Sequence, residues 1–548
     1  MAIGQYFNNK RVQIPGSYAT ITSGETSSFR DLDFGKCLII DTGTLGAEYC
    51  GGSGVNGEFA QGKDAIYSFK NLEDFRFFIK GGMYWQLAQG LFTPDRMNPS
   101  AVGVSELLFV RAAKTTASTM TFTATGGDSN GGTLKIKTLD EGNWANGEKS
   151  GNLLVKGYGF NFKSGILDPE KWVMQIWRGT FTGTYSDGLP FNEVDKDQTS
   201  PILMAQSPEF NNMNELIAWA KYDPTFNKHF RLDPTSSASG TGEIQGSDIN
   251  VTEGDYTVST GATENYDGDA WKKVIKSIEG LDFNFVFTDK FGNSNYNDSK
   301  NKEVISQITN DKYKKFFFTA IADDEENFSQ SIAAAQTLNS PYVVATHGSV
   351  GLASELAPSG VRWWGAIYNM AAQIGRLAGL QPQIPLTTKS IGVDRLKHQF
   401  SEQDMNAALD AGLLVTVYDS ALRRNVVLQG INTLQDNRVL FTKEGKSFSI
   451  QFMRCIEQLN RELIINSKID LLSVENGVNS NTLNPGVLKS WTEKYLQSKV
   501  ATETLDNLLL KFRNVTVNKL DDSYQVNYEV VINNEINKIF FTGFLFSK

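Results

Sequence analysis

Three short runs indicate the architecture of this chain: CLIID at residues 37–41, DFNFVFT at 282–288 and KFFFT at 315–319. Each is an almost continuous apolar segment, which is typical of a strand that is buried on both faces. Between and beyond these runs lie segments with helical spacing of apolar residues, for example at 72–80 and 327–338. Asn71 and Ser401, each with an Asp three residues later, are expected to cap helices, and Gly412 is expected to end the second of them. Pro485 suits the first position of a later helix. Strands that alternate with helices predict an α/β layer arrangement.

The composition changes between residues 115 and 270, where Thr, Ser, Gly and Asn dominate and apolar residues alternate, as in TLKIKT at 133–138. Within this part, residues 232–270 hold eight acids and no Lys or Arg, which is typical of an exposed surface. The parts on either side both alternate apolar strands with helices, so the sequence predicts a discontinuous α/β (α+β) core domain with an inserted β-rich domain. The expected boundaries are an amino-terminal arm at 1–20, core at 21–114, an outer β-rich insertion at 115–270, core at 271–533 and a carboxyl-terminal arm at 534–548.

Length and charge exclude several classes of protein. A chain of 548 residues exceeds the ~250–300 residues at which single cores stop growing, so several domains are expected. The net charge of −9 argues against non-specific binding to nucleic acid or to an anionic membrane. No segment approaches the ~20 consecutive apolar residues of a membrane span, and no secretory signal is apparent. Three cysteines, none in a CxxC pair, make no disulfide framework and indicate folding in a reducing cytoplasm.

Two glycine-rich motifs match nucleotide-binding patterns by letter only. GSGVNG at 52–57 fits GxGxxG, but the run CLIID ends ten residues too early for the strand-to-helix turn that a dinucleotide site needs. GEFAQGKD at 57–64 fits the phosphate-binding loop, except that Asp64 replaces the Ser or Thr that ligates Mg²⁺. Both stretches are therefore interpreted as one flexible glycine loop.

Other candidates for chemistry are weak. His229, His347 and His398 are far apart in sequence and have no metal-ligand neighbours, so a zinc site or a His-dependent triad is disfavoured. The pair Trp363 and Trp364 could stack a sugar, but its helical spacing with later apolar residues indicates core packing. An α/β carbohydrate-active enzyme and a host-binding module remain the alternatives from other functional classes.

Both ends of the chain are unusually apolar. The residues concerned are Ile3, Tyr6, Phe7, Val12 and Ile14 at the start, and Phe540, Phe541, Phe544 and Phe546 at the end. Free termini are usually polar unless something binds them, so two interpretations are open. Either both ends pair within their own core, or they add as strands to neighbouring subunits, which would build rings or helices.

In the order of its motifs the chain resembles the tail sheath proteins of contractile-tailed bacteriophages. Each motif is short, but together they extend over more than 400 residues. They are PGSY at 15–18, NLEDF at 71–75, ELLFVR at 106–111, EGNWAN after the strand at 133–137, and the segments 371–380, 382–389, 412–417 and 430–434.

The resemblance implies a structural subunit rather than an enzyme, without nucleotide, metal or other cofactor. Hexameric rings of the subunit would stack around a tail tube, with both arms pairing with neighbours, and contraction would drive the tube through the host envelope. The implied partners are the chain itself, the tail tube, baseplate and tail terminator proteins, with no nucleic acid or membrane, in a virion assembled in the host cytoplasm. Lys489, Lys494 and Lys499 are candidates to face the tube, although a solvated helix face explains them equally well. The sheath of a phage-derived injection device is the close alternative.

Overall fold

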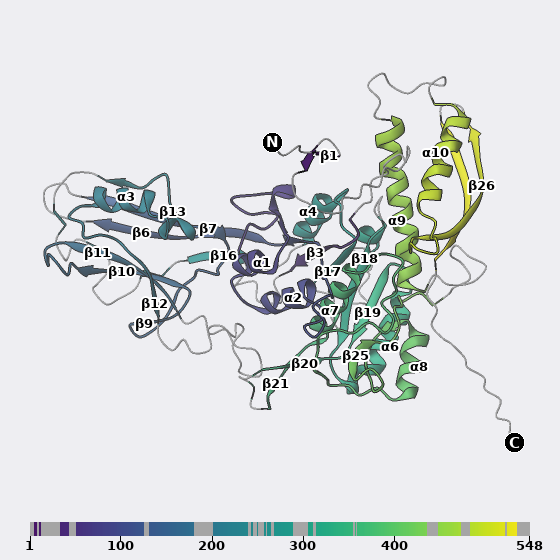
Figure 1. Cartoon of the computed structure of the whole chain (residues 1–548). Coiled ribbons are helices and arrows are strands. Elements are labelled where there is room, and N and C mark those ends of the chain that lie inside the picture. The colour runs from purple at the N-terminus through teal and green to yellow at the C-terminus, as the bar shows by residue number, and fades with distance from the viewer. Residues whose placement is uncertain are drawn as a thin grey trace. The chain divides into compact units, whose positions relative to one another are not determined.

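The structure of this protein is a computed structural model (Figure 1). It describes residues 5–7, 10–12, 33–42, 51–124, 131–179, 201–238, 243–244, 249, 257–258, 260–264, 268–288, 305–310, 314–354, 357, 359–435, 448–472, 483–520 and 523–533. These residues divide into two compact units. The smaller comprises the described parts of Met1–Leu32, Asn460–Lys499 and Phe512–Glu529, and the larger comprises the rest.

The larger unit is built on a seven-stranded sheet in the order β23-β19-β18-β17-β3-β5-β4. All neighbouring strands are parallel except β4, which is antiparallel to β5. The strands are β3 (Lys36–Asp41), β4 (Ile66–Phe69), β5 (Glu106–Arg111), β17 (Phe285–Thr288), β18 (Phe316–Ala322), β19 (Val343–His347) and β23 (Leu413–Leu414). The three apolar runs thus lie side by side as β3, β17 and β18, and the prediction of an α/β layer is confirmed.

Helices cover both faces of this sheet, which explains its continuous apolar strands. On one face, Leu38 and Ile40 pack with Trp271 of helix α4 (Gly268–Ile278), and α6 (Phe328–Leu338) covers β18 and β19. On the other face, Phe109 contacts rings of α1 (Leu72–Ile79) and α2 (Met83–Phe92). Helix α7 (Ala366–Ala378) packs against α2, β3, β18 and β19.

Local signals place several of these helices correctly. The Asn71 side chain accepts a hydrogen bond from the Asp74 amide at the start of α1. Ser401 and Asp404 form the predicted capping box of α8 (Glu402–Ala411), which ends at Gly412 in the left-handed conformation. These expected caps are confirmed.

The prediction that Trp363 belongs to the core is wrong. Trp363 and Trp364 lie in strand β21 (Val361–Trp364), ahead of α7. Successive side chains of a strand point to opposite faces, so Trp364 is buried while Trp363 is 41% exposed.

Two antiparallel sheets, drawn in blue to teal in Figure 1, are formed by residues that lie in sequence between β5 and β17. The first contains β6 (Lys114–Ala124), β7 (Gly132–Glu141), β13 (Phe230–Leu232), β14 (Ser237–Ala238) and β16 (Thr260–Glu264). The second contains β10 (Tyr158–Ser164), β11 (Trp172–Arg178), β12 (Ile202–Gln206) and β15 (Thr257–Val258). Both sheets and α3 (Met213–Tyr222) share one hydrophobic core, in which the rings of Phe122 and Phe162 are 5.1 Å apart. A short pair, β8 (Glu148–Ser150) with β9 (Leu153–Lys156), completes this part.

The carboxyl-terminal part contains two helices and a hairpin. Helix α9 (Ile450–Ser467) continues into a π turn (Lys468–Leu472), and α10 (Pro485–Ser498) starts at a proline, as predicted. Strands β26 (Leu509–Lys519) and β27 (Tyr524–Ile532) follow. In the part of the chain that the structure describes, no helix is both long and apolar enough to span a membrane. The boundaries expected for the arms and the insertion stay predictions.

Candidate functional site

The β26–β27 hairpin is the first candidate site for assembly. It is a two-stranded sheet, and no third strand among the described residues pairs with it. One face carries half-buried apolar or aromatic side chains, and the other carries exposed polar ones such as Glu529, which pairs with Arg513 at 2.6 Å. A lone hairpin of two strands is marginally stable, and unpaired edges accept further strands through backbone hydrogen bonds. The edges of this hairpin are therefore the candidate positions for addition of a further strand.

The predicted strand-exchange residues lie largely outside the described part of the chain. Tyr6 and Phe7 belong to β1 (Gln5–Phe7) and Val12 belongs to β2 (Lys10–Val12); these strands pair antiparallel with each other. Outside the described residues are Ile3, Ile14, Phe540, Phe541, Phe544 and Phe546. Exchange between subunits stays a prediction for all of them.

The three lysines proposed to face the tube do not share one environment. Lys489 and Lys494 are exposed on α10, where Lys489 lies 3.8 Å from Glu493. Lys499 is buried instead, and its ammonium group lies 2.7 Å from the buried Glu462 carboxylate. The Tyr495 hydroxyl donates to the same carboxylate at 3.1 Å. Lys499 therefore joins α9 to α10, and only the other two remain candidates.

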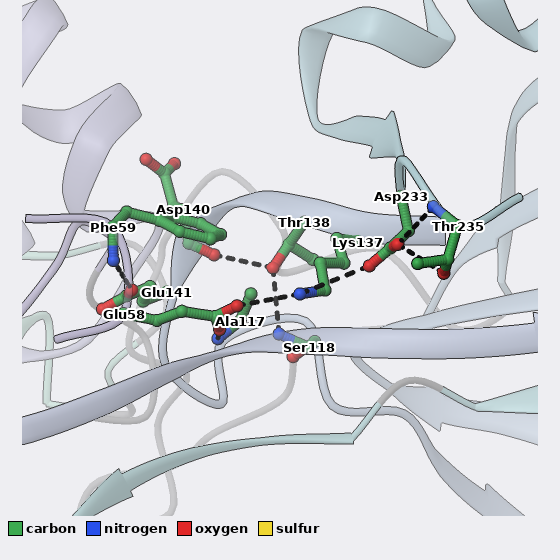
Figure 2. A network of polar contacts seen from close by, with 10 residues as sticks. All are labelled: Glu58, Phe59, Ala117, Ser118, Lys137, Thr138, Asp140, Glu141, Asp233 and Thr235. Atoms are coloured by element: carbon green, nitrogen blue, oxygen red, sulfur yellow. Dashed lines mark hydrogen bonds and ion pairs between the residues drawn. The ribbon is translucent and has the colours of Figure 1, made fainter. Parts of the chain in front are cut away.

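The buried carboxylate of Glu141 is the centre of a polar junction that sequence reasoning missed (Figure 2). Glu141 ends β7 and accepts a hydrogen bond from the Ser53 hydroxyl at 2.6 Å. The Thr115 hydroxyl and the Phe59 amide donate to it as well. Since Ser53 and Phe59 lie in the glycine loop, these bonds fasten that loop to β7.

A second set of charges reinforces the same junction. The Lys137 ammonium group lies 2.8 Å from Glu58 in the loop and 3.3 Å from Asp233 beyond β13 (Figure 2). The hydrogen bond with Lys137 lowers the pKa of Glu58 below its usual range. Hydrogen bonds from Thr235 hold the pKa of Asp233 at about 2. Both carboxylates therefore stay ionised, and Lys137 links the loop to the antiparallel sheet.

The glycines of the rejected nucleotide motifs now have a packing explanation. A Cβ atom on Gly57 would lie 1.8 Å from the Ser53 hydroxyl and 2.2 Å from a Glu141 oxygen, so only glycine fits. Lys63 lies in a 3-10 turn (Gly62–Ala65) that leads into strand β4 rather than a helix, as expected for a loop without phosphate. Residues 51–55 of this loop are buried, so its first part packs against the rest of the larger unit.

Two histidines that are 51 residues apart meet in the fold. Nε2 of His347 lies 3.0 Å from Nδ1 of His398, and the Ser331 hydroxyl lies 2.9 Å from Nδ1 of His347. Burial lowers the pKa of His347 to about 4 and also lowers that of His398. No group of three or more His, Cys, Asp or Glu side chains suited to a metal occurs among the described residues. No sequence pattern indicates this pair, because its spacing fits no ligand or catalytic motif.

Known proteins resemble this chain in fold but not in sequence. No family model matches the chain, and no curated protein matches it in sequence. The sheath tail protein of Desulfitobacterium hafniense is 14% identical, with a TM-score of 0.53 over 94% of this chain and 100% of that chain. The sheath tail protein of Listeria innocua is 13% identical, with a TM-score of 0.50 over 91% of this chain and 96% of that chain. The chain therefore has the fold of these two sheath tail proteins.

Proposed function

We propose that this chain is the structural subunit of a contractile phage tail sheath. In this proposal, stacked hexameric rings surround a tail tube, and their contraction drives the tube through the host envelope. The observation that carries the proposal is the correspondence of fold with a sheath tail protein along 94% of the chain. The sheath of a phage-derived injection device is the close variant, because the same subunit would serve both.

Strand exchange is the proposed link between subunits. The β26–β27 hairpin offers edges without a partner among the described residues, and the sequence supplies apolar ends long enough to add a strand. A five-residue strand adds about four backbone hydrogen bonds at ~0.5–1.5 kcal/mol net each. Such links hold neighbours together while their bodies rotate, which a contracting sheath requires.

The remaining parts take supporting roles in this proposal. The two antiparallel sheets form an inserted domain on the outside of the sheath, and the Glu141 junction fastens it to the core. Lys489 and Lys494 are exposed and face the tail tube. Baseplate and terminator proteins cap the polymer, and the assembled sheath belongs to the virion.

Negative-stain microscopy of the purified chain at high concentration tests the proposal. We expect tubes, or long contracted sheaths without an inner tube. Deletion of residues 539–548 or 1–14 is expected to abolish tubes while circular dichroism shows a folded chain. A matched variant replaces Phe540, Phe541, Phe544 and Phe546 by Ser at unchanged length, and like the deletion it should form no tubes. Tubes formed equally well by both carboxyl-terminal variants would exclude exchange of that arm, and a discrete small oligomer of the unaltered chain would exclude the sheath.

A further inference from the structure

An exposed aromatic ring and an exposed arginine flank one glycine on a small sheet of the larger unit. Strand β20 (Val350–Ala353) pairs with β21 on one side and with β22 (Arg395–Leu396) on the other. Gly351 lies directly opposite both Trp363 and Arg395. A Cβ on Gly351 would lie 2.6 Å from a Val361 methyl and 3.3 Å from both the Trp363 ring and the Arg395 Cβ. Directly opposed residues share a face, so the Trp363 ring and the stem of Arg395 lie on one face of this sheet, on either side of Gly351.

A second hairpin adds to this surface. Strands β24 (Thr416–Asp419) and β25 (Arg424–Val427) are joined by a turn in which Asp419 accepts hydrogen bonds from the amides of Ala421 and Leu422. Arg423 has a left-handed φ of 53°, and both it and Arg424 are exposed. The exposed fractions of Tyr418 and Leu422 are 56% and 54%. The turn therefore presents apolar and basic side chains to solvent.

Residues 391–394 bridge the two hairpins by hydrogen bonds. The Ile391 amide donates to the Asn425 carbonyl at 3.1 Å, and the Asn425 side chain donates to the Val393 carbonyl at 2.7 Å. One residue later, the Asp394 amide donates to the Gly351 carbonyl at 2.9 Å. These bonds link both hairpins through residues 391–394. We name the exposed aromatic, apolar and basic side chains of the two hairpins and β22 the arginine–aromatic surface: Trp363, Arg395, Tyr418, Leu422, Arg423 and Arg424.

The charges of this surface lack ion-pair partners among the described residues. Arg395, Arg423 and Arg424 form no ion pair with any residue that the structure describes. The nearby carboxylates of Asp394 and Asp419 already accept hydrogen bonds from backbone amides. On a chain with a net charge of −9, this is a local concentration of unpaired positive charge.

We propose that the arginine–aromatic surface binds an acidic segment of a protein partner. Trp, Tyr and Arg are the residue types enriched at the centres of protein interfaces. Guanidinium groups bind carboxylates through paired hydrogen bonds, and an exposed indole covers an apolar side chain between the acids. A nucleic acid is the weaker fit, because two Asp carboxylates interrupt the arginines and the whole chain repels an extended polyanion. The proposal is independent of the sheath function.

Binding of a labelled peptide to the full chain tests this inference. The probe is a fluorescein-labelled ten-residue peptide of Asp and Glu with two central leucines, followed by fluorescence anisotropy at low salt. Arg395→Glu together with Arg424→Glu is expected to weaken binding at least tenfold, and Trp363→Ala several-fold. The matched control is Lys70→Glu with Lys221→Glu, which changes the net charge equally at two exposed lysines elsewhere and should change the affinity less than twofold.

Three results would overturn the proposal. One is no detectable binding of the acidic peptide to the unaltered chain. A second is an equal loss of affinity in the two double variants, which would show a response to net charge alone. The third is a single-stranded DNA decamer that binds more tightly than the peptide and loses its affinity in the Arg395/Arg424 variant, which would assign the surface to nucleic acid.

Discussion

Lowering the pH from 7.5 to 4.5 is expected to destabilise the larger unit through His347. The side chain is fully buried, and burial lowers its pKa in the folded protein to about 4, against about 6.5 in an unfolded chain. Between these values the unfolded state binds the proton and the folded state does not, so stability falls as the pH falls through this window. Relative to pH 7.5, the lowered pKa of His347 should reduce the free energy of unfolding by about 1.4 kcal/mol at pH 5.5 and about 2.5 kcal/mol at pH 4.5.

The geometry explains why His347 stays neutral. In one neutral arrangement that uses every polar group, the Ser331 hydroxyl donates to Nδ1 of His347, and Nε2–H of His347 donates to Nδ1 of His398. Protonation of Nδ1 would reverse the bond with Ser331, so that the buried hydroxyl accepts and loses its own acceptor. His398 is buried as well, and its pKa is also lowered, so it takes up a proton no more easily.

Two measurements check this prediction. Carbon-13 labelling of histidine gives only three imidazole signals, and the His347 signal should keep its neutral shift down to pH 5. Urea unfolding measures how the free energy of unfolding depends on pH. Between pH 6.5 and 4.5, the His347→Gln variant should take up about one proton fewer on unfolding than the unaltered chain. The matched control is Ser331→Ala, which removes a hydrogen bond to His347 but keeps the buried imidazole, so its pH dependence should remain. A His347 signal that titrates near pH 6.5 would refute the reasoning.

Three further predictions concern stability, each measured by urea unfolding at neutral pH. Gly57→Ala should lower the free energy of unfolding by about 2 kcal/mol or more, because its Cβ overlaps a buried hydroxyl and a carboxylate. The matched control is Gly430→Ala, whose Cβ would have a side-chain carbon at 3.3 Å as its nearest neighbour and which should cost below about 1 kcal/mol. Equal losses in the two variants would contradict the packing argument. Lys499→Ala should cost about 3–5 kcal/mol by leaving Glu462 buried without its cation, and Glu462→Gln in the same chain should recover part of the loss. A change below 1 kcal/mol would show that this pair is solvated. Ser401→Ala should cost about 1 kcal/mol through loss of the capping box, and an unchanged midpoint would show that the cap is not needed.

Much of the fold could be predicted because its signals are local. The runs at 37–41, 282–288 and 315–319 are apolar on both faces, and this pattern alone indicates buried strands. The caps at Asn71 and Ser401 depend on residues three positions apart, so they could be read directly from the sequence. Such features need no knowledge of distant parts of the chain.

The polar sites could not be predicted in the same way. Glu141 and Ser53 are 88 residues apart, and nothing near either residue shows that they meet. Trp363 and Trp364 are adjacent residues of the same type, yet one is exposed and one is buried, because they lie in a strand rather than a helix. The strength of such contacts depends on burial, which many distant segments determine together.

By itself, the sequence determined the α/β layer, the change of composition at 115–270, the caps and the apolar ends, because each of these depends on residue type and short spacing. Only the tertiary structure decided that Lys499 is buried against Glu462, that the glycine loop closes on Glu141, and that His347 meets His398. The physical reason is that a charge or a polar group is stable in the interior only beside its partner, and packing of the whole fold brings the partners together.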